Sequence, residues 1–478
     1  ARPIVVCSSR RANRQKATKA ENGSEDETEV MHVLILGAGA TGLTAAYLLR
    51  RAGLRVTLLE AAAKPGGLLT TFSVGQGDPL ECYYHHCFTH DVELHWLLAE
   101  LGLTDRLMYR PTSMAVYRDG RLWPFNRPLD VLRFGPIGWV DRLRFGLSGW
   151  LLAHWACYTR KEDQAALAWF RRWAGTQATE AIWTPLLRGK FGDWADRVSL
   201  AWLAGRLRQR ARSRRSGQEQ LGYVRGSFRV LVDRLVEWLT DNQVSLHFSC
   251  PVEELVMENG RLVGVRAGGR EFRADATVAT LAPPILAGLV RPMAPDYARQ
   301  LEQIKYLGAL CMVLAMQKPL LGMYWTNVAE PAYEFVGVVE QTQLAPSDWY
   351  GGRHLVYLAR YLRPEDPLWQ LPDPVIQQRW LDQLSQMTGR PVRQEVEQVW
   401  LFRARYAAPL PEVGFSHRIP AMRSPLPGLF VASMVHIYPD ERSINNCIRV
   451  AAELVRTVGF AETANQVPRG PGLAGRYG

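Results

Sequence analysis

The chain has 478 residues, too many for one compact core and enough for two domains. Hydrophobic residues make up 47% of it and charged residues 22%, a balance that excludes disordered, collagen-like and coiled-coil chains. Its 7 cysteines form no CxxC pair, so we expect a reducing compartment, no disulfide framework and no metal site. No apolar run reaches the roughly 18 residues that a membrane-spanning helix needs.

The net charge of +11 is concentrated in one block, residues 111–225. This block holds 20 Lys and Arg residues against 9 Asp and Glu, together with 9 of the 16 Trp. Its run Arg206–Arg215 contains six Arg in ten residues. Three interpretations stay open for the run: a solvated helix face, contact with an anionic membrane surface, or binding of a substrate phosphate or carboxylate. No recognition motif accompanies the charge, so no nucleic-acid partner is expected.

An apolar segment in the same block favours the membrane contact. Phe145–Tyr158 spans 14 residues, too few to cross a bilayer, and Trp139, Trp150 and Trp155 lie on or beside it. Trp settles at membrane–water interfaces, and Arg attracts anionic headgroups. We therefore expect a cytoplasmic protein that docks peripherally on a membrane.

The two ends of the chain differ from the rest. Residues 1–30 have no sustained apolar period and are predicted to be disordered. Their Arg and Ser content is typical of an organelle-targeting arm, whereas their acidic residues favour sequence upstream of a start at Met31. The Gly- and Pro-rich tail, residues 466–478, is expected to be loose.

A dinucleotide-binding unit begins directly after Met31. His32–Leu36 has the aliphatic pattern of a buried parallel strand, and the sequence GAGATG follows it at once. A helix is then predicted up to Gly53, and a second strand over Arg55–Glu60. Strand, GxGxxG, helix, strand and terminal acid together form the context that the dinucleotide motif requires.

Each position of the glycine motif has a separate task. Gly37 permits the tight turn, Gly39 lets the backbone approach a pyrophosphate, and Gly42 lets helix and strand pack closely. The free N–H groups and the dipole at the helix start, around Ala40 and Thr41, can hold phosphate charge.

The residues after the second strand indicate which dinucleotide binds. Glu60 can accept hydrogen bonds from ribose hydroxyls and would repel the 2′-phosphate of NADP. Gly66-Gly67 then lets the chain run close along the dinucleotide. This start resembles that of the FAD-dependent superfamily of amine oxidases, phytoene desaturases and protoporphyrinogen oxidases, which implies FAD as cofactor. The family has Arg before its glycine pair, and Lys64 stands near that place, keeping the charge without the bidentate fork.

The resemblance extends over about residues 31–460. Pro251–Leu255 resembles the family strand whose valine, here Val252, meets the adenine. Pro427–Ala432 resembles the last FAD strand, after which the family has Gly-Asp. Ser433-Met434 stands there instead, and its backbone N–H groups can serve the phosphate–ribityl region. Further similar stretches are Ala274–Thr280, Phe191–Ser199 and Leu221–Phe228.

A second resemblance is to UDP-galactopyranose mutase, another FAD protein of the same fold. Tyr84–Phe88 (YHHCF) and Trp123–Asn126 (WPFN) are similar to two of its stretches, the first of which lies at the flavin. This likeness implies that His86 is close to the flavin and makes it the candidate catalytic residue. On a strand, neighbouring His85 and His86 would point to opposite faces, so at most one could face the flavin. The histidines show no ligand spacing, so no metal is expected.

The predicted fold is an α/β, two-domain flavoprotein. A discontinuous Rossmann-like FAD-binding domain takes residues 31–110, 216–290 and 400–465. A mixed α+β substrate domain takes 111–215, mostly helical, and 291–399, where the runs ALCMVLAM and HLVYLARYL suggest an antiparallel sheet. The flavin ring should lie at the junction, facing a pocket closed by the second domain.

Three function classes remain open. The first is an FAD-dependent oxidase or desaturase, in which a lipophilic or bulky small organic substrate transfers hydride to flavin N5. The second is a mutase acting on a sugar nucleotide without net oxidation. The third is a non-catalytic FAD-binding protein, which the intact cofactor motif disfavours.

Overall fold

A parallel β-sheet carries the glycine motif in the computed structural model, which describes residues 30–215 and 218–470. Within these residues its five strands run in the order β11-β2-β1-β15-β21, every neighbouring pair parallel. The strands are β1 (His32–Leu36), β2 (Arg55–Leu59), β11 (Ser245–His247), β15 (Ala276–Ala279) and β21 (Leu429–Val431). The predicted first strand is confirmed, and the second ends one residue early. The predictions for residues 1–29 and 471–478 lie outside the described part of the chain.

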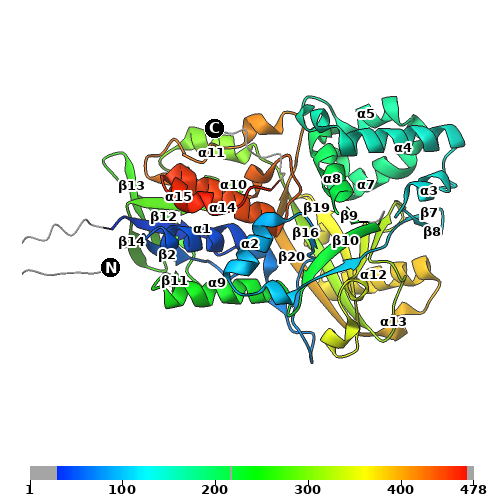
Figure 1. Ribbon diagram of the computed structural model, residues 1–478, viewed down its shortest axis with the longest axis horizontal. Coiled ribbons are helices and arrows are strands. Elements are labelled where there is room, and N and C mark those ends of the chain that lie inside the picture. Colours follow the sequence, from blue (N-terminus) through cyan, green and yellow to red (C-terminus); the bar gives the residue numbers. More distant parts are fainter. Residues whose placement is uncertain (1–29, 216–217, 471–478) are drawn as a thin grey trace, which may run out of the picture. The chain divides into compact units, whose positions relative to one another are not determined.

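Both faces of this sheet are covered, as its continuous aliphatic strands require. Alternate side chains of β1 enter two different cores: Val33 and Ile35 one, Leu34 and Leu36 the other. The first core lies under α1 (Ala40–Arg51), α2 (Val92–Glu100), α9 (Arg229–Asp241), α14 (Ile444–Val458) and α15 (Ala461–Asn465) (Figure 1). The second lies under α10 (Pro283–Val290), α11 (Pro295–Glu302) and the antiparallel β12 (Val252–Glu258), β13 (Arg261–Ala267) and β14 (Arg270–Arg273).

A larger mixed sheet forms the second half of the architecture. Among the described residues seven strands pair in the order β20-β16-β19-β18-β17-β7-β8, antiparallel except for β17 and β7. They are β7 (Met114–Arg118), β8 (Arg121–Pro124), β16 (Tyr306–Met316), β17 (Trp325–Val328), β18 (Gly337–Glu340), β19 (His354–Leu362) and β20 (Val396–Pro409). The two runs predicted as antiparallel strands are β16 and β19. The expected boundary at residue 400 falls inside β20, which pairs with β16, so residues 400–409 belong to this sheet.

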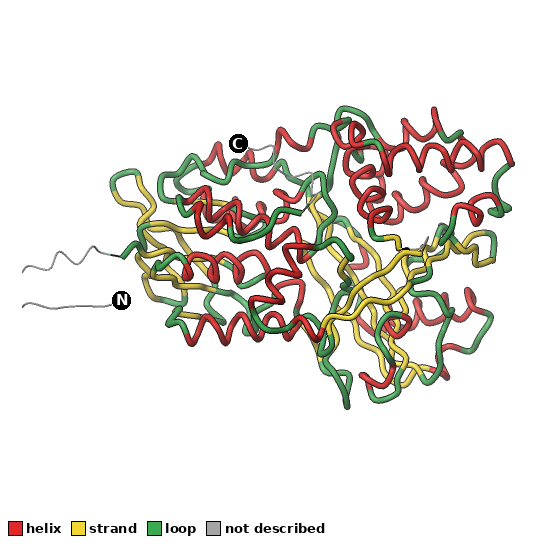
Figure 2. The backbone as a smooth tube through the Cα atoms, viewed as in Figure 1, coloured by secondary structure: helices red, strands yellow, loops and turns green. Residues whose placement is uncertain are grey.

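Helices of residues 128–212 form one group (Figure 2). Their buried side chains make a separate core. The helices are α3 (Pro128–Leu132), α4 (Trp139–His154), α5 (Ala166–Trp173), α6 (Thr176–Ala178), α7 (Thr184–Phe191) and α8 (Leu200–Arg212). Helix α8 changes character along its length: Leu200–Gly205 is buried, and the arginine run follows. No helix in residues 30–215 or 218–470 is long and apolar enough to cross a membrane.

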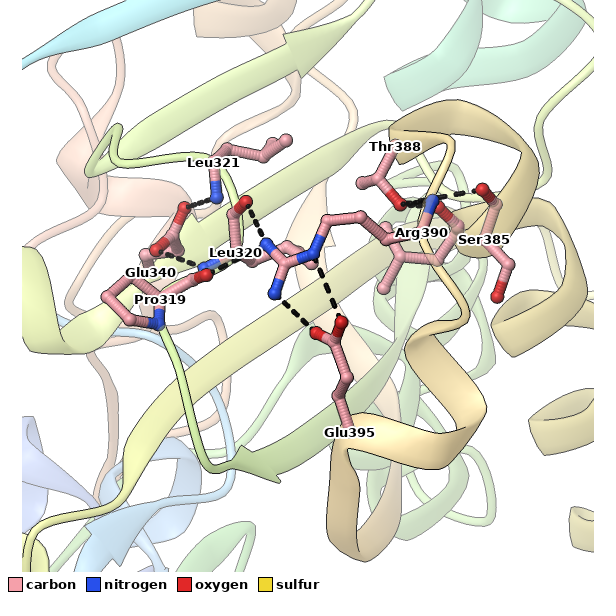
Figure 3. A network of polar contacts seen from close by, with 9 residues as sticks. Pro319, Leu320, Leu321, Glu340, Ser385, Thr388, Arg390 and Glu395 are labelled. Atoms are coloured by element: carbon pink, nitrogen blue, oxygen red, sulfur yellow. Dashed lines mark hydrogen bonds and ion pairs between the residues drawn. The ribbon is translucent and has the colours of Figure 1, made fainter.

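An ionic network ties the mixed sheet to α12 (Asp373–Thr388) and α13 (Val392–Glu395). Arg390 pairs with Glu395 and donates hydrogen bonds to the carbonyl oxygens of Pro319 (2.9 Å) and Leu320 (2.8 Å) (Figure 3). The buried carboxylate of Glu340 accepts the N–H of Leu320 (3.1 Å) in the same loop. The network therefore fixes the loop that joins β16 to β17.

Two small sheets of short strands complete the strand pairing. In the first, β3 (Thr71–Phe72) pairs with β4 (Leu80–Glu81). In the second, β10 (Gln218–Val224) pairs with β5 (Cys87–Phe88), β6 (Leu107–Pro111) and β9 (Arg214–Arg215). Glu81 is fully buried among them. Its carboxylate accepts hydrogen bonds from Tyr223 Oη (2.6 Å) and the Phe228 N–H (2.7 Å). Burial raises the pKa of Glu81 from 4.5 to about 7, partly offset by these two hydrogen bonds.

Glu81→Gln tests this buried acid. Because its pKa is higher in the folded protein, the folded state keeps a proton that the unfolded chain releases between about pH 4.5 and 7. Glu81 therefore reduces stability as pH rises through that window. Gln imitates the protonated acid. The free energy of unfolding of the variant should therefore exceed that of the unaltered protein by at most about 3 kcal/mol at pH 8, and the two values should be equal near pH 4.5. Urea unfolding at each pH measures these free energies. The same difference between variant and unaltered protein at pH 4.5 and pH 8 would contradict the raised pKa of Glu81.

Candidate functional site

The glycine loop brings backbone against backbone. Gly37 has a φ of +105°, and a Cβ on Gly42 would lie 1.9 Å from the Gly37 carbonyl oxygen. Only glycine therefore lets α1 begin this close to β1. The second glycine pair closes on the first, because the Gly66 N–H donates to Ala38 O (2.9 Å) and Gly39 and Gly66 form a parallel bridge.

Gly39 differs from its neighbours because it faces open space. A Cβ there would meet no atom within 4 Å, and Gly39, Ala40, Thr41 and Gly42 all line one large cavity. The start of α1 has no side-chain cap, so its first N–H groups and its dipole are available to an anion. This cradle has the shape and the donors that a dinucleotide pyrophosphate needs.

Not every predicted cofactor residue lies at that cavity. Gly66, His86, Ser433 and Met434 line it together with the start of α1. The predicted residues that do not line it are Gly37, Glu60, Lys64, Gly67 and Val252. The Glu60 carboxylate at the end of β2 accepts the N–H groups of Ala38 (2.7 Å) and Ala62 (2.8 Å). Lys64 is exposed, and Val252 begins β12 half-buried. The cofactor-binding roles predicted for these residues stay predictions.

The cavity extends well beyond the glycine loop. Its volume is about 440 Å³, within the range of small-molecule sites. Its walls come from the seven-stranded sheet, from α1, α7, α8 and α14, and from the segments that follow β15 and β21. Aromatic side chains make up much of the remaining lining: Tyr83, Tyr84, Trp183, Trp202, Tyr306, Trp325, Tyr361 and Tyr406.

His85 and His86 both line the cavity, and which of them faces the flavin stays a prediction. Residues 83–86 are irregular rather than a strand, and the alternation of a strand does not apply. His86 Nδ1 lies 3.0 Å from Tyr324 Oη, and His85 Nδ1 donates to Tyr83 O (2.6 Å). Burial lowers the pKa of His86 to about 3 and that of His85 to about 4, so both rings are neutral near pH 7.

The segment after β21 supplies an unsatisfied hydroxyl. Ser433 Oγ is buried and has no hydrogen-bond partner within the described part of the chain, although it lines the cavity. Buried hydroxyls are normally paired, so a ligand that accepts or donates here would be stabilised. Together with the cradle at Gly39, this group fits a bound dinucleotide cofactor. Among residues 30–215 and 218–470, no three His, Cys, Asp or Glu side chains are placed to hold a metal ion.

Sequence reasoning left a substrate-binding role open for the arginine run, but it did not single out the arginines that form a charged wall in the same cavity. Arg206 and Arg210, one turn apart on α8, both line it, and Arg206 pairs with Glu441 (2.8 Å). Arg212 and Arg214 of the same run are exposed. The run is therefore not a single solvated face. The i, i+4 spacing of Arg206 and Arg210 was the available signal.

The sequence pattern of the flavin-containing amine oxidoreductase family matches residues 40–448. The chain belongs to this family. The match confirms the superfamily, the FAD cofactor and the FAD-dependent oxidoreductase class predicted from the sequence. It also agrees with the cradle, since the residues present there fit that cofactor.

Individual relatives are more distant. The chain is 25% identical over 355 residues to coproporphyrinogen III oxidase of Propionibacterium freudenreichii subsp. freudenreichii, covering 59% of this chain and 63% of that one. A candidate protoporphyrinogen oxidase from Exiguobacterium sp. 255-15 has a similar structure, with a TM-score of 0.72, 20% identity and coverage of 90% and 98%. Reduced UDP-galactopyranose mutase gives a TM-score of 0.71 at 14% identity, covering 92% and 96%. These two likenesses show the fold.

Gly39→Val tests the cradle. The valine side chain would extend into the open space where the pyrophosphate must approach, so the purified variant should have lost its flavin. Acid precipitation and chromatography of the yellow supernatant measure FAD, which we expect to be bound non-covalently in the unaltered protein. Gly288→Val is the matched control, because a Cβ on that exposed helical glycine also meets nothing within 4 Å. Equal flavin content in the two variants would contradict a pyrophosphate site at Gly39.

Proposed function

We propose that the protein is an FAD-dependent oxidase or desaturase that removes hydride from a C–H bond of a bulky, largely apolar organic substrate. The observation that carries the proposal is the continuity of one cavity from the glycine cradle at Gly39 to the aromatic chamber. When bound, FAD supplies the hydride acceptor. On this view the chain contributes binding, orientation and exclusion of water.

The aromatic chamber is held by polar contacts behind its rings. Arg442 donates to Tyr361 Oη (2.9 Å) and to the Ala407 carbonyl oxygen, so one wall of the chamber is fixed. His86 is fixed in the same way by Tyr324. Rigid aromatic walls orient a ring-bearing substrate at little cost in conformational entropy. A neutral His86 can hydrogen-bond to a ligand without adding charge beside it.

The domain organisation belongs to the same proposal. Residues 31–110, 216–290 and 410–465 would hold the cofactor, with the last segment starting after β20. Residues 111–215 and 291–409 would enclose the substrate. The cavity draws its walls from both sets, which supports a flavin ring at the junction.

Two relatives suggest which substrates to test first. Similarity to coproporphyrinogen III oxidase makes porphyrinogens the leading candidates. The alternative, a sugar-nucleotide mutase, is supported by the mutase-like histidine segment at the cavity and by the shared fold. Non-catalytic FAD binding is the third outcome.

Anaerobic mixing of the flavin-loaded protein with porphyrinogens, polyenes, amines and UDP-sugars distinguishes these functions. An oxidase or desaturase substrate should bleach the flavin absorbance, and His86→Ala should slow that bleaching with FAD content unchanged. Isomerisation of a UDP-sugar by pre-reduced protein, with no bleaching by any compound, would replace the proposal by the mutase. If the flavin is not bleached and no UDP-sugar is isomerised, the result would favour a non-catalytic FAD-binding protein.

We propose further that the protein docks on an anionic bilayer through α4. Large apolar side chains at helical spacing are 51 to 72% exposed on this helix: Trp139, Leu143, Leu147 and Trp150. Figure 1 places α4 at the outer edge of the helical part. Arg144 on the same helix and Arg133 at the end of α3 are also exposed, and their charge is complementary to anionic headgroups. Docking there would bring a lipophilic substrate close to the protein without a passage through water.

Liposome flotation tests this surface. We expect binding to anionic vesicles, weaker binding to neutral ones, and loss of binding at high salt, because headgroup attraction is screened over about 8 Å at physiological ionic strength. Leu143→Glu with Leu147→Glu should abolish flotation. Ile285→Glu alters an exposed apolar residue elsewhere and should leave it unchanged. No lipid-bound fraction at low salt would refute docking.

A further inference from the structure

The cavity wall is strongly cationic. Among its described lining residues, a single carboxylate, Glu441, faces five cationic side chains: Lys190, Arg206, Arg210, Arg360 and Arg442. Three of the arginines pair with carboxylates, namely Arg206 with Glu441 (2.8 Å), Arg210 with Glu219 (3.4 Å) and Arg360 with Asp366 (3.4 Å). Lys190 and Arg442 have no such partner within 4.0 Å in residues 30–215 and 218–470.

The two unpaired cations differ in their hydrogen bonding. Arg442 is committed to Tyr361 and to the Ala407 carbonyl oxygen. The side chain of Lys190, near the end of α7, makes no hydrogen bond within the described residues. Its Nζ lies over the rings of Trp202 (4.8 Å), Tyr361 (5.1 Å) and Phe191 (5.5 Å). Rings attract the charge without using its three N–H donors, so these donors stay available to a ligand.

The surroundings of Lys190 increase the benefit of a bound anion. Burial lowers the pKa of Lys190 well below its usual value, and the neighbouring Arg206, Arg442 and Arg210 lower it further, whereas Glu441 raises it. An anion placed against Nζ would oppose both effects. A cation in the same place would add to the repulsion among these charges.

We propose that Lys190 forms a subsite for an anionic group of the substrate, a carboxylate or a phosphate, and that cationic amines are excluded although the chain belongs to the amine oxidoreductase family. The proposal rests on the proposed function in taking this cavity as the substrate site. It adds to that function the specification that the substrate is an anion. Arg206, one turn of α8 from Arg210, lies close enough to influence Lys190 electrostatically and stabilises the same anion through its field.

Direct binding to the flavin-loaded protein separates this subsite from turnover. Four probes share one ring system: naphthoate, naphthyl phosphate, naphthalenemethanol and naphthylmethylamine. Calorimetric titration should show at least one anion binding about tenfold more tightly than the alcohol, with the amine weakest, as expected for a charge-assisted hydrogen bond. The tighter of the two anions identifies the substrate group. Failure of every turnover assay would reject the proposed function without changing these affinities.

Matched lysine variants test the residue itself. Lys190→Met should reduce the anion to the affinity of the alcohol, while Lys190→Arg should preserve most of the preference. Lys305→Met is the control, because Lys305 Nζ also lies over a ring, that of Trp194 (5.2 Å), but is 3.5 Å from the Glu412 carboxylate and lies outside the cavity lining.

Three results would overturn the subsite. The first is an amine that binds as tightly as the anions. The second is equal anion affinity in Lys190→Met and Lys305→Met. The third is a folded Lys190→Met protein without flavin, which would place Lys190 at the cofactor. If Lys190→Met does not fold, the four probes on the unaltered protein and on Lys190→Arg decide.

Discussion

The approach of Gly42 to the Gly37 carbonyl is the constraint on which the site depends. With 1.9 Å between that oxygen and any added Cβ, helix and strand can meet only where side chains are absent. Because α1 starts there, its uncapped N–H groups face the cavity. Helix α14, whose Cys447 lines the same cavity, then shares a core with α1. One backbone contact thus positions the cofactor end of the site.

The cavity combines three kinds of lining. Backbone donors come from the glycine loop, neutral histidines and aromatic rings come from several elements, and arginines with Lys190 add cationic groups. These groups come from different supersecondary units, so their combination is a property of the tertiary fold. Burial favours the neutral forms of both His86 and Lys190, and a bound anion would shift Lys190 back toward its charged form.

Local chemistry made the first unit predictable, and tertiary contacts made the rest unpredictable. The strand at His32–Leu36, the glycine turn and the helix before Gly53 all follow from residues adjacent in sequence. His85 and His86 could not be oriented from sequence, since irregular backbone has no fixed side-chain period. Lys190 meets Trp202 and Tyr361 from other elements, and no spacing within the chain encodes that contact. Some arginines of the run line the cavity and others are exposed, because successive residues of a helix point in different directions. The arginine-rich composition alone does not distinguish the two sets.

The strand order of the parallel sheet has a consequence during synthesis. Strand β1 is flanked by β2 and β15, and β15 is completed at its other edge by β21, formed from residues near the far end of the chain. At ribosomal rates of about 5–20 residues per second, the segment between β1 and β21 takes on the order of half a minute to emerge. Through that interval the aliphatic β1 lacks part of its sheet, and Ser433 and Cys447 have yet to join the cavity. A complete flavin site can therefore form only late in translation or after it.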